Sequence, residues 1–169
     1  YGVICSHKVA SCRQGGVQKK IIIKSTKMQI TTFALGCFWG PDDYFSKLKG
    51  VIKTRAGYAG GIKKDPSYYN LGDHAETIEI TFDPKIISFE ELLKHFWKEH
   101  DPTEVHTTQY KSAIFYLNEE QKKIAEKSKQ AIEKKLGRKV ATQIQKAGTF
   151  YQAEEYHQKY LQKGKGRVC

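Results

Sequence analysis

The chain has 169 residues, 39% of them hydrophobic, and a formal net charge of +11. A chain of this length can form one compact domain, and it contains no run of about 18 or more apolar residues that would predict a membrane-spanning helix. Residues 1–27 supply six of the surplus positive charges, so the remainder is mildly basic. Without an RNP, helix-turn-helix or zinc-finger pattern, we expect no nucleic-acid partner.

Residues 1–27 contain no Asp or Glu. We expect this segment to be a basic leader or extension outside the core, and its composition also fits the remnant of a targeting peptide. Cys5, His7 and Cys12 are too loosely spaced, without a CxxC pair, to predict a zinc site. Residues 28–169 are expected to form a single domain.

A thiol lies at the first predicted strand-to-helix turn. Residues 28–35 are rich in β-branched and aromatic side chains and predict a strand. A helix is expected from near Trp39 to Gly50, because Pro41 suits the first helical turn. Cys37 therefore lies between the strand and the positive end of the helix dipole.

A strand predicted at 75–82 places a carboxyl group among apolar side chains. Successive strand residues point to opposite faces, so Glu76 shares a face with Ile78, Ile80 and Phe82. We expect this face to point inward, and burial to raise the pKa of the Glu76 carboxyl.

The remaining pattern continues to alternate strands and helices. In chain order it predicts a strand at 51–58, a loop at 57–73, a helix capped by Ser88, a strand at 111–117, a helix from Asn118 to Gly137, a strand at 139–146 and a last helix at 152–162. This order predicts an α+β fold, a two-layer α/β sandwich with a mixed sheet, packed helices and a ferredoxin-like core.

The sequence GCFWG at 36–40 displays Cys37 between glycines and aromatic residues. Free amides and the dipole at a helix N-terminus lower the pKa of a thiol, and the thiolate is the reactive form. An arbitrary cysteine is more often a small buried hydrophobe, but its position here favours a reactive role.

A second cysteine, Cys169, follows glycines at 164 and 166. Glycine-rich segments are flexible, so this thiol could reach a sulfenic acid on another cysteine and capture it as a disulfide. The same residue could equally be an incidental thiol near the end of the printed sequence.

Several motifs occur in an order that resembles the peptide methionine sulfoxide reductase family of the A type, which acts on the S epimer of the sulfoxide. They are GCFWG at 36–40, GYAGG at 57–61, DPSY at 65–68, HAE at 74–76, EHDPT at 99–103, TQYKSAIFY at 108–116 and EEYHQKYLQK at 154–163. GCFWG is specific, HAE and TQY are weak alone, and the ordered set spans essentially residues 28–169.

The resemblance implies how the reaction would proceed. Cys37 would attack the sulfoxide sulfur, giving methionine and a sulfenic acid on itself. Glu76 would supply the proton for the departing oxygen, although a carboxylate in this place could instead pair with a lysine. Cys169 matches the recycling cysteine, so a disulfide between Cys37 and Cys169 would form and be reduced by a thioredoxin-like partner. Because the printed sequence ends there, we expect one resolving step, with no metal and no organic cofactor.

The resemblance also implies the substrate contacts. Phe38 and Trp39 would receive the substrate methyl group in an aromatic pocket, and the hydroxyl groups of Tyr68 and Tyr110 would hold the sulfoxide oxygen. Tyrosines at such positions more often serve packing.

One loop departs from the family pattern. Many members of the family have a longer loop with an acidic residue just ahead of the TQY segment, whereas the loop of this chain is short. Ungapped counting back from Tyr110 puts Val105 at that position, so Asp101 or Glu104 could substitute or the contact could be absent. His100 and His157 are expected to be structural or capping residues rather than catalytic bases.

Two other classes of protein share some of these features. A thiol hydrolase would also display Cys37, but it needs a histidine base, whereas the inward group found here is Glu76. A nucleic-acid module would bind with steep salt dependence and tolerate the loss of Cys37. We expect a cytoplasmic monomer, or an organellar protein if residues 1–27 derive from a targeting peptide.

Overall fold

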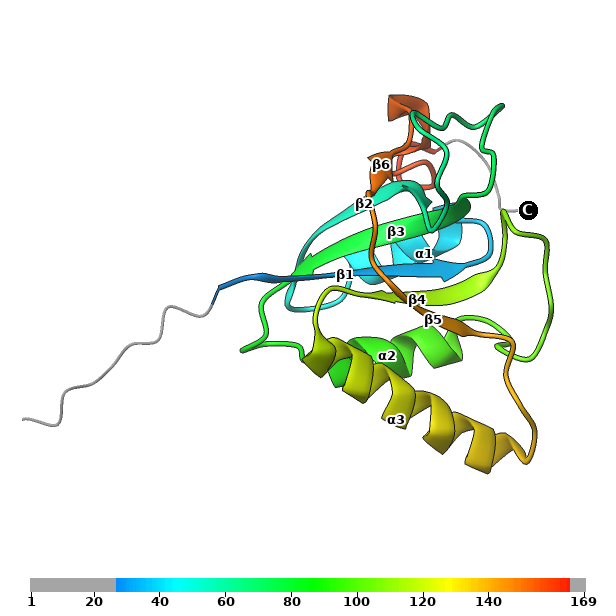
Figure 1. The fold of residues 1–169 in the computed structure, drawn as a ribbon. Coiled ribbons are helices and arrows are strands. Elements are labelled where there is room, and N and C mark those ends of the chain that lie inside the picture. The colour runs from blue at the N-terminus through cyan, green and yellow to red at the C-terminus, as the bar shows by residue number, and fades with distance from the viewer. Residues whose placement is uncertain (1–26, 165–169) are drawn as a thin grey trace, which may run out of the picture.

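A computed structural model describes residues 27–164, and within them one mixed sheet carries three helices on one face (Figure 1). The elements in chain order are β1 (Gln29–Leu35), α1 (Trp39–Ser46), β2 (Val51–Ala59), β3 (Ala75–Phe82), α2 (Phe89–Lys98), β4 (Ser112–Tyr116), α3 (Glu119–Leu136), β5 (Gln143–Lys146), β6 (Tyr151–Gln152) and a 3-10 turn at Glu155–His157. No helix in this part of the chain is long and apolar enough to cross a bilayer.

The strand order is β5-β4-β1-β3-β2-β6. β1 lies at the centre, where Phe33 is paired with Ile78 of β3 on one side and with Ile114 of β4 on the other. All pairings are antiparallel except that of β4 with β5. The expected α+β fold with a mixed sheet is confirmed.

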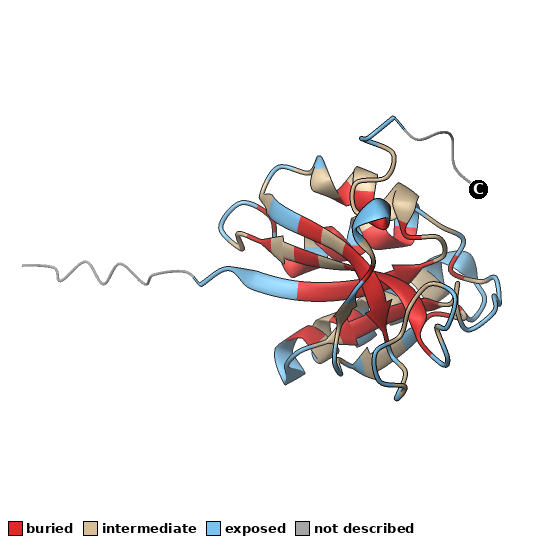
Figure 2. Cartoon of the chain, turned by 90° about the horizontal axis from the view of Figure 1, so that it is seen from above, coloured by how far each residue is buried: buried red, intermediate tan, exposed pale blue. Residues whose placement is uncertain are grey.

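The main core lies between the sheet and its helices. The Phe33 ring contacts Phe45 of α1 and both Phe89 and Phe96 of α2, at centroid distances of 5.8, 6.3 and 5.0 Å. In Figure 2 the buried residues follow the central strands, and the exposed ones gather at the ends and in the loops. Burial of these apolar side chains is the main favourable contribution to folding.

The opposite face of the sheet is lined by small residues and is covered differently. Ala34, Ala75 and Ala113 form a cluster there with Phe115, and Ala147 packs on it. Figure 1 shows the connection from β5 to β6 crossing this face. The connection thereby returns the chain to the other edge of the sheet and brings the residues after β6 next to the end of β2.

The caps expected for the two longer helices are present. The Ser88 hydroxyl accepts from the Glu91 N–H at 3.1 Å, and the Asn118 side chain accepts from the Gln121 N–H at 2.9 Å. Gly137 ends α3 in the left-handed region at φ 67°, where glycine has no steric penalty.

The helix predicted at 152–162 is wrong. Residues 151–152 form β6 and only 155–157 make a 3-10 turn. The reason is tertiary: the Gln158 side chain bonds both backbone groups of Ala56, and Lys159 is held at φ 53°. These contacts replace the hydrogen bonds of a helix.

The strand predicted at 139–146 begins only at Gln143. The Val140 N–H donates to the Glu133 side chain and the Ala141 N–H to the Pro102 carbonyl, so these two amides are used outside the sheet. The leader at 1–27, apart from Lys27, and the cysteines Cys5, Cys12 and Cys169 lie outside the described residues.

Candidate functional site

The turn between β1 and α1 presents Cys37 at the end of the central strand. Gly36 has φ 82°, a conformation that L side chains rarely adopt, and it redirects the chain out of the sheet. Phe38 is the N-cap residue of α1, and its carbonyl accepts from the Asp42 N–H at 2.9 Å. Cys37 is partly exposed immediately before this helix, as expected.

The Glu76 carboxyl group faces the same turn. It is 1% exposed, accepts from the Phe38 N–H at 3.1 Å and from the Gln109 side-chain amide at 2.8 Å. Burial raises the pKa of Glu76, and the hydrogen bonds from Gln109 and Phe38 oppose this only in part. Within residues 27–164, the hydrogen-bond partners of the carboxyl group are therefore an amide side chain and a backbone N–H rather than a lysine.

Gln109 was missed by the reasoning from sequence. Besides its side-chain bond to Glu76, its carbonyl accepts from the Glu76 N–H at 2.8 Å. Gln109 therefore holds both the backbone and the side chain of Glu76. Its place in the TQY segment was the one available signal. Nothing in its residue type indicated that it would contact a strand 33 residues earlier.

Aromatic rings surround the Cys37 turn. Phe38 is 1% exposed and its ring lies 6.0 Å from that of Tyr58. The partly exposed indole of Trp39 stacks on Tyr160 at 3.9 Å with an angle of 8° between the planes. These rings offer an apolar surface next to the thiol.

His157 connects the predicted substrate residues. Its Nδ1 accepts from the Trp39 indole N–H at 3.1 Å, and its ring lies 5.1 Å from Phe38 and 4.7 Å from Tyr68. Burial lowers the pKa of His157, which favours the neutral ring. Its Nε2 is buried without a hydrogen-bond partner in residues 27–164. The ring therefore supports Trp39, in agreement with the expected structural role.

An ion pair between a buried carboxylate and a partly exposed lysine fixes the segment that carries His157. The Asp42 carboxylate is 1% exposed and accepts from both the backbone N–H and the ammonium of Lys159, at 2.9 and 2.6 Å. The Thr54 hydroxyl donates to the same carboxylate at 2.5 Å. This cluster ties residues after β6 to the first turn of α1, directly behind the Cys37 turn.

Tyr68 is positioned by a carboxylate from the same segment. Glu154 accepts from the Tyr68 N–H at 3.0 Å and from the buried Tyr58 hydroxyl at 2.7 Å. Burial opposes ionisation of Glu154, but its hydrogen bonds, with these two the largest among them, together with the charge of His157 outweigh burial and lower its pKa. Tyr110 is half-buried, follows Gln109 directly, and its N–H donates to Thr107.

The structure thus places Cys37, Phe38 and Glu76 together and joins Trp39 and Tyr68 through His157. Cys169 lies outside the described residues. No group of three or more His, Cys, Asp and Glu side chains within residues 27–164 is arranged to hold a metal ion.

The two acids proposed for the altered loop make local contacts. Asp101 accepts from the Thr103 N–H at 2.9 Å and lies 3.7 Å from Arg138, while Glu104 is exposed and lies 3.3 Å from His106. His100 bridges the Phe96 carbonyl and the Ser112 hydroxyl at 2.9 and 2.7 Å. This contact makes His100 the structural residue that the sequence indicated.

Comparison with known proteins was consistent with these features. A family model described as "Peptide methionine sulfoxide reductase" matches residues 29–169. The peptide methionine sulfoxide reductase MsrA of Methanothermobacter thermautotrophicus is 43% identical over 157 residues, which cover 85% of this chain and 92% of that protein.

Solved structures agree with the fold. Mxr1 from Saccharomyces cerevisiae in reduced form superposes with a TM-score of 0.80 at 34% identity, covering 89% of this chain and 94% of that one. Mxr1 solved in complex with Trx2 gives a TM-score of 0.62 at 33% identity, covering 84% of this chain and 91% of the other.

Proposed function

The chain belongs to the peptide methionine sulfoxide reductase family, and from this membership we infer that it reduces methionine S-sulfoxide to methionine, with Cys37 as the nucleophile. It is an oxidoreductase that works by thiol chemistry. The substrates are the free amino acid or oxidised methionine in proteins, so the biological role is protein repair after oxidative damage.

The observation that carries the proposal is the contact between Glu76 and the Phe38 N–H at 3.1 Å. It holds a buried carboxyl group, whose pKa is raised by burial, beside the residue that follows Cys37. Because burial favours the neutral form, more of this carboxyl group is protonated at a given pH than of an exposed glutamate, and the protonated form can donate its proton to the sulfoxide oxygen.

The reaction transfers one oxygen atom. The Cys37 thiolate attacks the sulfoxide sulfur and forms a transient bond between the two sulfur atoms, while the oxygen takes the proton of Glu76, which becomes a carboxylate. The S–O bond and the sulfur–sulfur bond then break as the hydroxyl group passes to Cys37, which leaves methionine and a sulfenic acid on Cys37. The sulfoxide is reduced to the thioether by two electrons, and the Cys37 sulfur is oxidised by two.

The aromatic residues would bind the substrate. We place the substrate methyl group against Phe38 and Trp39, whose rings line the Cys37 turn. The Tyr68 and Tyr110 hydroxyl groups would hold the sulfoxide oxygen. The anchoring of Tyr68 by Glu154 supports its part in this arrangement.

Recycling would use a second thiol. Cys169 would attack the sulfenic sulfur of Cys37, release water and form a disulfide, which a thioredoxin dithiol then reduces. The yeast neighbour solved with Trx2 supports thioredoxin as the reductant. This scheme needs no metal and no organic cofactor.

We further propose that residues 28–169 form one reductase domain that acts as a monomer in the cytoplasm, or in an organelle if residues 1–27 derive from a targeting peptide. The match of the family model from residue 29 to residue 169 supports the domain boundary.

A single-turnover experiment tests this chemistry. Reduced protein is mixed with an excess of S-sulfoxide peptide without reductant, and methionine and cysteine states are quantified by mass spectrometry. We expect one methionine per chain and a peptide that joins Cys37 to Cys169. In Cys169→Ser we expect the same methionine yield, with a dimedone-reactive sulfenic acid kept on Cys37. A disulfide that joins Cys5 or Cys12 to Cys37 would contradict the assigned recycling thiol.

A further inference from the structure

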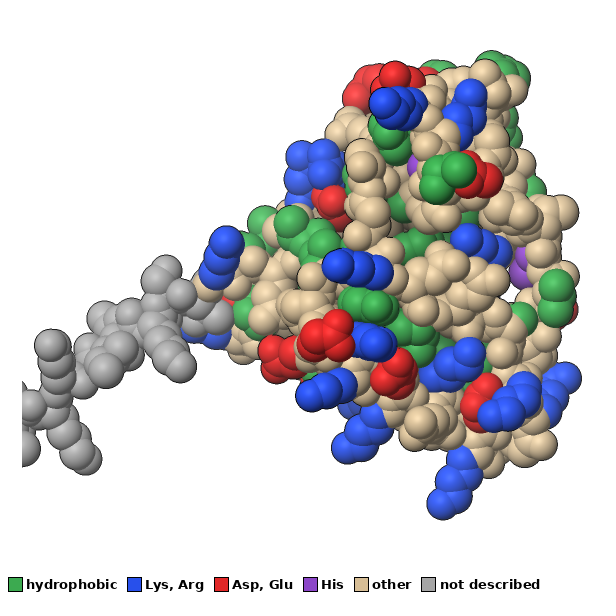
Figure 3. Space-filling view, viewed as in Figure 1, with side chains coloured by type: hydrophobic (Ala, Val, Ile, Leu, Met, Phe, Trp, Pro, Cys, Tyr) green, Lys and Arg blue, Asp and Glu red, His purple; other side chains and the backbone are tan. Residues whose placement is uncertain are grey.

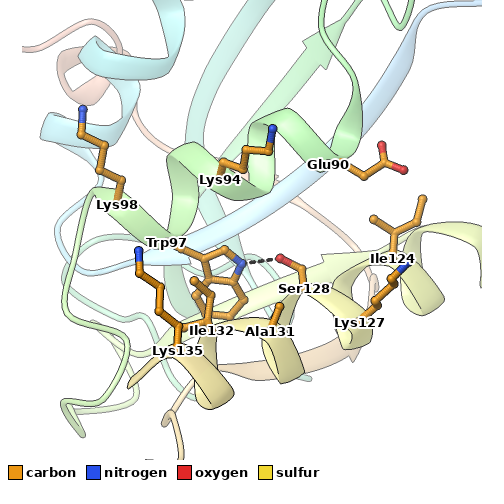
Figure 4. Close-up of a pocket in the computed structure, with 10 residues that line it drawn as sticks. All are labelled: Glu90, Lys94, Trp97, Lys98, Ile124, Lys127, Ser128, Ala131, Ile132 and Lys135. Atoms are coloured by element: carbon orange, nitrogen blue, oxygen red, sulfur yellow. Dashed lines mark hydrogen bonds between the residues drawn. The ribbon is translucent and has the colours of Figure 1, made fainter. Parts of the chain in front are cut away.

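A groove lies between α2 and α3, away from the Cys37 turn. It encloses a volume of about 640 Å³, and none of its lining residues belongs to the candidate site. The residues that line it are Glu90, Lys94, Trp97, Lys98, Ile124, Lys127, Ser128, Ala131, Ile132 and Lys135 (Figure 4). Its volume falls within the range of about 300–1,000 Å³ that is typical of small-molecule sites.

The floor of the groove is apolar and fixed. The Trp97 indole crosses from α2 to α3, where its N–H donates to the Ser128 hydroxyl at 2.6 Å (Figure 4). Ile124 and Ile132 pack against the core from α3 and leave part of their surface exposed. Because the indole N–H has a partner, the floor presents carbon atoms and does not require a polar ligand group.

The rim of the groove is charged, in contrast to its apolar floor. It has four lysines and one glutamate, and the ammonium of Lys94 lies 2.6 Å from Glu91 outside the groove. Lys98, Lys127 and Lys135 have no ion pair with any residue in 27–164. In Figure 3 basic side chains, with acidic ones between them, lie over the lower part of the molecule, around α3. Lysine stems extend the apolar wall and hold their charges at its edge.

This charge distribution argues against either terminal segment of the same chain as the occupant of the groove. Residues 1–26 contain only basic charged residues, and so do residues 165–169, so both would be repelled by the rim. The complementary ligand has an apolar body and an anionic head, and the volume favours a small molecule over a folded partner.

We propose that the groove between α2 and α3 binds a fatty-acid anion, with the acyl chain over Trp97 and its carboxylate near Lys98 and Lys135, at the end of the groove where both helices finish (Figure 4). The site is independent of the Cys37 chemistry. It would let the chain sense or carry free acyl anions while the reductase site stays accessible.

Dodecanoate, used below its micelle concentration, is the probe. The two indole N–H groups of the chain give an internal control in nitrogen-proton NMR spectra, because Trp97 lies in the groove and Trp39 in the candidate site. We expect dodecanoate to shift the Trp97 signal saturably and leave the Trp39 signal in place. Butyrate should not bind, since it lacks the chain, and dodecyl maltoside should bind at least tenfold more weakly, since it lacks the charge.

Two variants separate the roles of charge and shape. Lys98→Gln, Lys127→Gln and Lys135→Gln together should weaken dodecanoate binding at least tenfold. The matched control Lys49→Gln, Lys53→Gln and Lys85→Gln removes the same charge from exposed sites outside the groove and should change binding less than twofold. Ala131→Phe fills the groove and should abolish binding while sulfoxide turnover is kept.

The proposal is overturned if dodecanoate leaves the Trp97 signal unchanged, or if it shifts the Trp39 signal first. It is also overturned if the two lysine triplets weaken binding equally, or if dodecyl maltoside binds as tightly as dodecanoate, because charge at the rim would then play no part. The last experiment measures binding of the protein to vesicles that contain anionic lipid. If the vesicles retain the protein but free dodecanoate gives no response, the groove binds a membrane surface instead of a free fatty-acid anion.

Discussion

The Phe38 nitrogen and a Glu76 carboxyl oxygen lie 3.1 Å apart, although they come from the N-cap of the first helix and from the third strand of the chain. The Gln109 side chain holds the second carboxyl oxygen at 2.8 Å. Each carboxyl oxygen of Glu76 therefore accepts a hydrogen bond, and the two bonds together fix the position of the acid relative to the Cys37 turn.

Glu76→Gln should lower sulfoxide turnover by about a hundredfold or more, because a glutamine cannot donate the proton that the departing oxygen needs. Glu79→Gln is the matched control, since Glu79 lies on the same strand, where it pairs with Arg55 at 2.5 Å on the other face of the sheet. Single-turnover rates of methionine formation would measure both. Equal rates for Glu76→Gln and the unaltered chain would remove Glu76 from the chemistry.

Stability should depend on pH through the same carboxyl group. Burial raises the pKa of Glu76 in the folded protein above its value of about 4.3 in an unfolded chain, so the folded state binds the proton more tightly. Its contribution to stability is then complete below about pH 4 and is lost as the pH rises through the folded pKa. As the pH rises through this interval, the urea midpoint of Glu76→Gln should increase relative to that of the unaltered chain. A difference between the two midpoints that stays constant with pH would contradict a raised pKa.

His157→Phe should loosen Trp39 while preserving the aromatic packing. The lost hydrogen bond at 3.1 Å is worth about 1 kcal/mol, so we expect KM for a sulfoxide peptide to rise about fivefold with a smaller change in kcat. Faster hydrogen exchange of the Trp39 indole N–H would identify the cause. His95→Phe, which breaks a 2.7 Å contact with Tyr44, should leave both quantities unchanged.

Asp42→Ala should destabilise the fold by about 3 kcal/mol. It leaves Lys159 and the Thr54 hydroxyl without the buried carboxylate that both contact. Breaking a fully buried ion pair typically costs about 3–5 kcal/mol, and the loss here should lie at the lower end because 32% of the Lys159 side chain is exposed. Asp43→Ala removes an exposed pair with Lys47 and should cost less than about 0.5 kcal/mol. Urea unfolding of both variants checks the difference, and similar losses would show that Asp42 is not the anchor.

The sequence predicted those features that depend on local pattern. Alternation in 75–82 predicted that Glu76 points inward, and Ser88 and Asn118 predicted where two helices begin. Periodicity reports which face is apolar and caps report where hydrogen bonding starts, so both can be read from neighbouring residues.

Contacts between distant segments could not be predicted in this way. A helical pattern at 152–162 was overridden by Gln158, which bonds a strand about a hundred residues earlier, and by Lys159, which reaches Asp42. Gln109 and His157 gave no local signal for their contacts with Glu76 and Trp39. Their places follow from the topology, which brings the end of β1, the loop before β4 and the segment after β6 to one end of the sheet.

The central claim is that Cys37 reduces the S epimer of methionine sulfoxide. The most direct measurement is dithiothreitol-driven reduction of a peptide prepared as separate S and R sulfoxides, by the unaltered chain and by Cys37→Ser. We predict turnover of the S epimer alone and its complete loss in Cys37→Ser. No turnover by folded, reduced protein, or turnover that survives the substitution, would contradict the account.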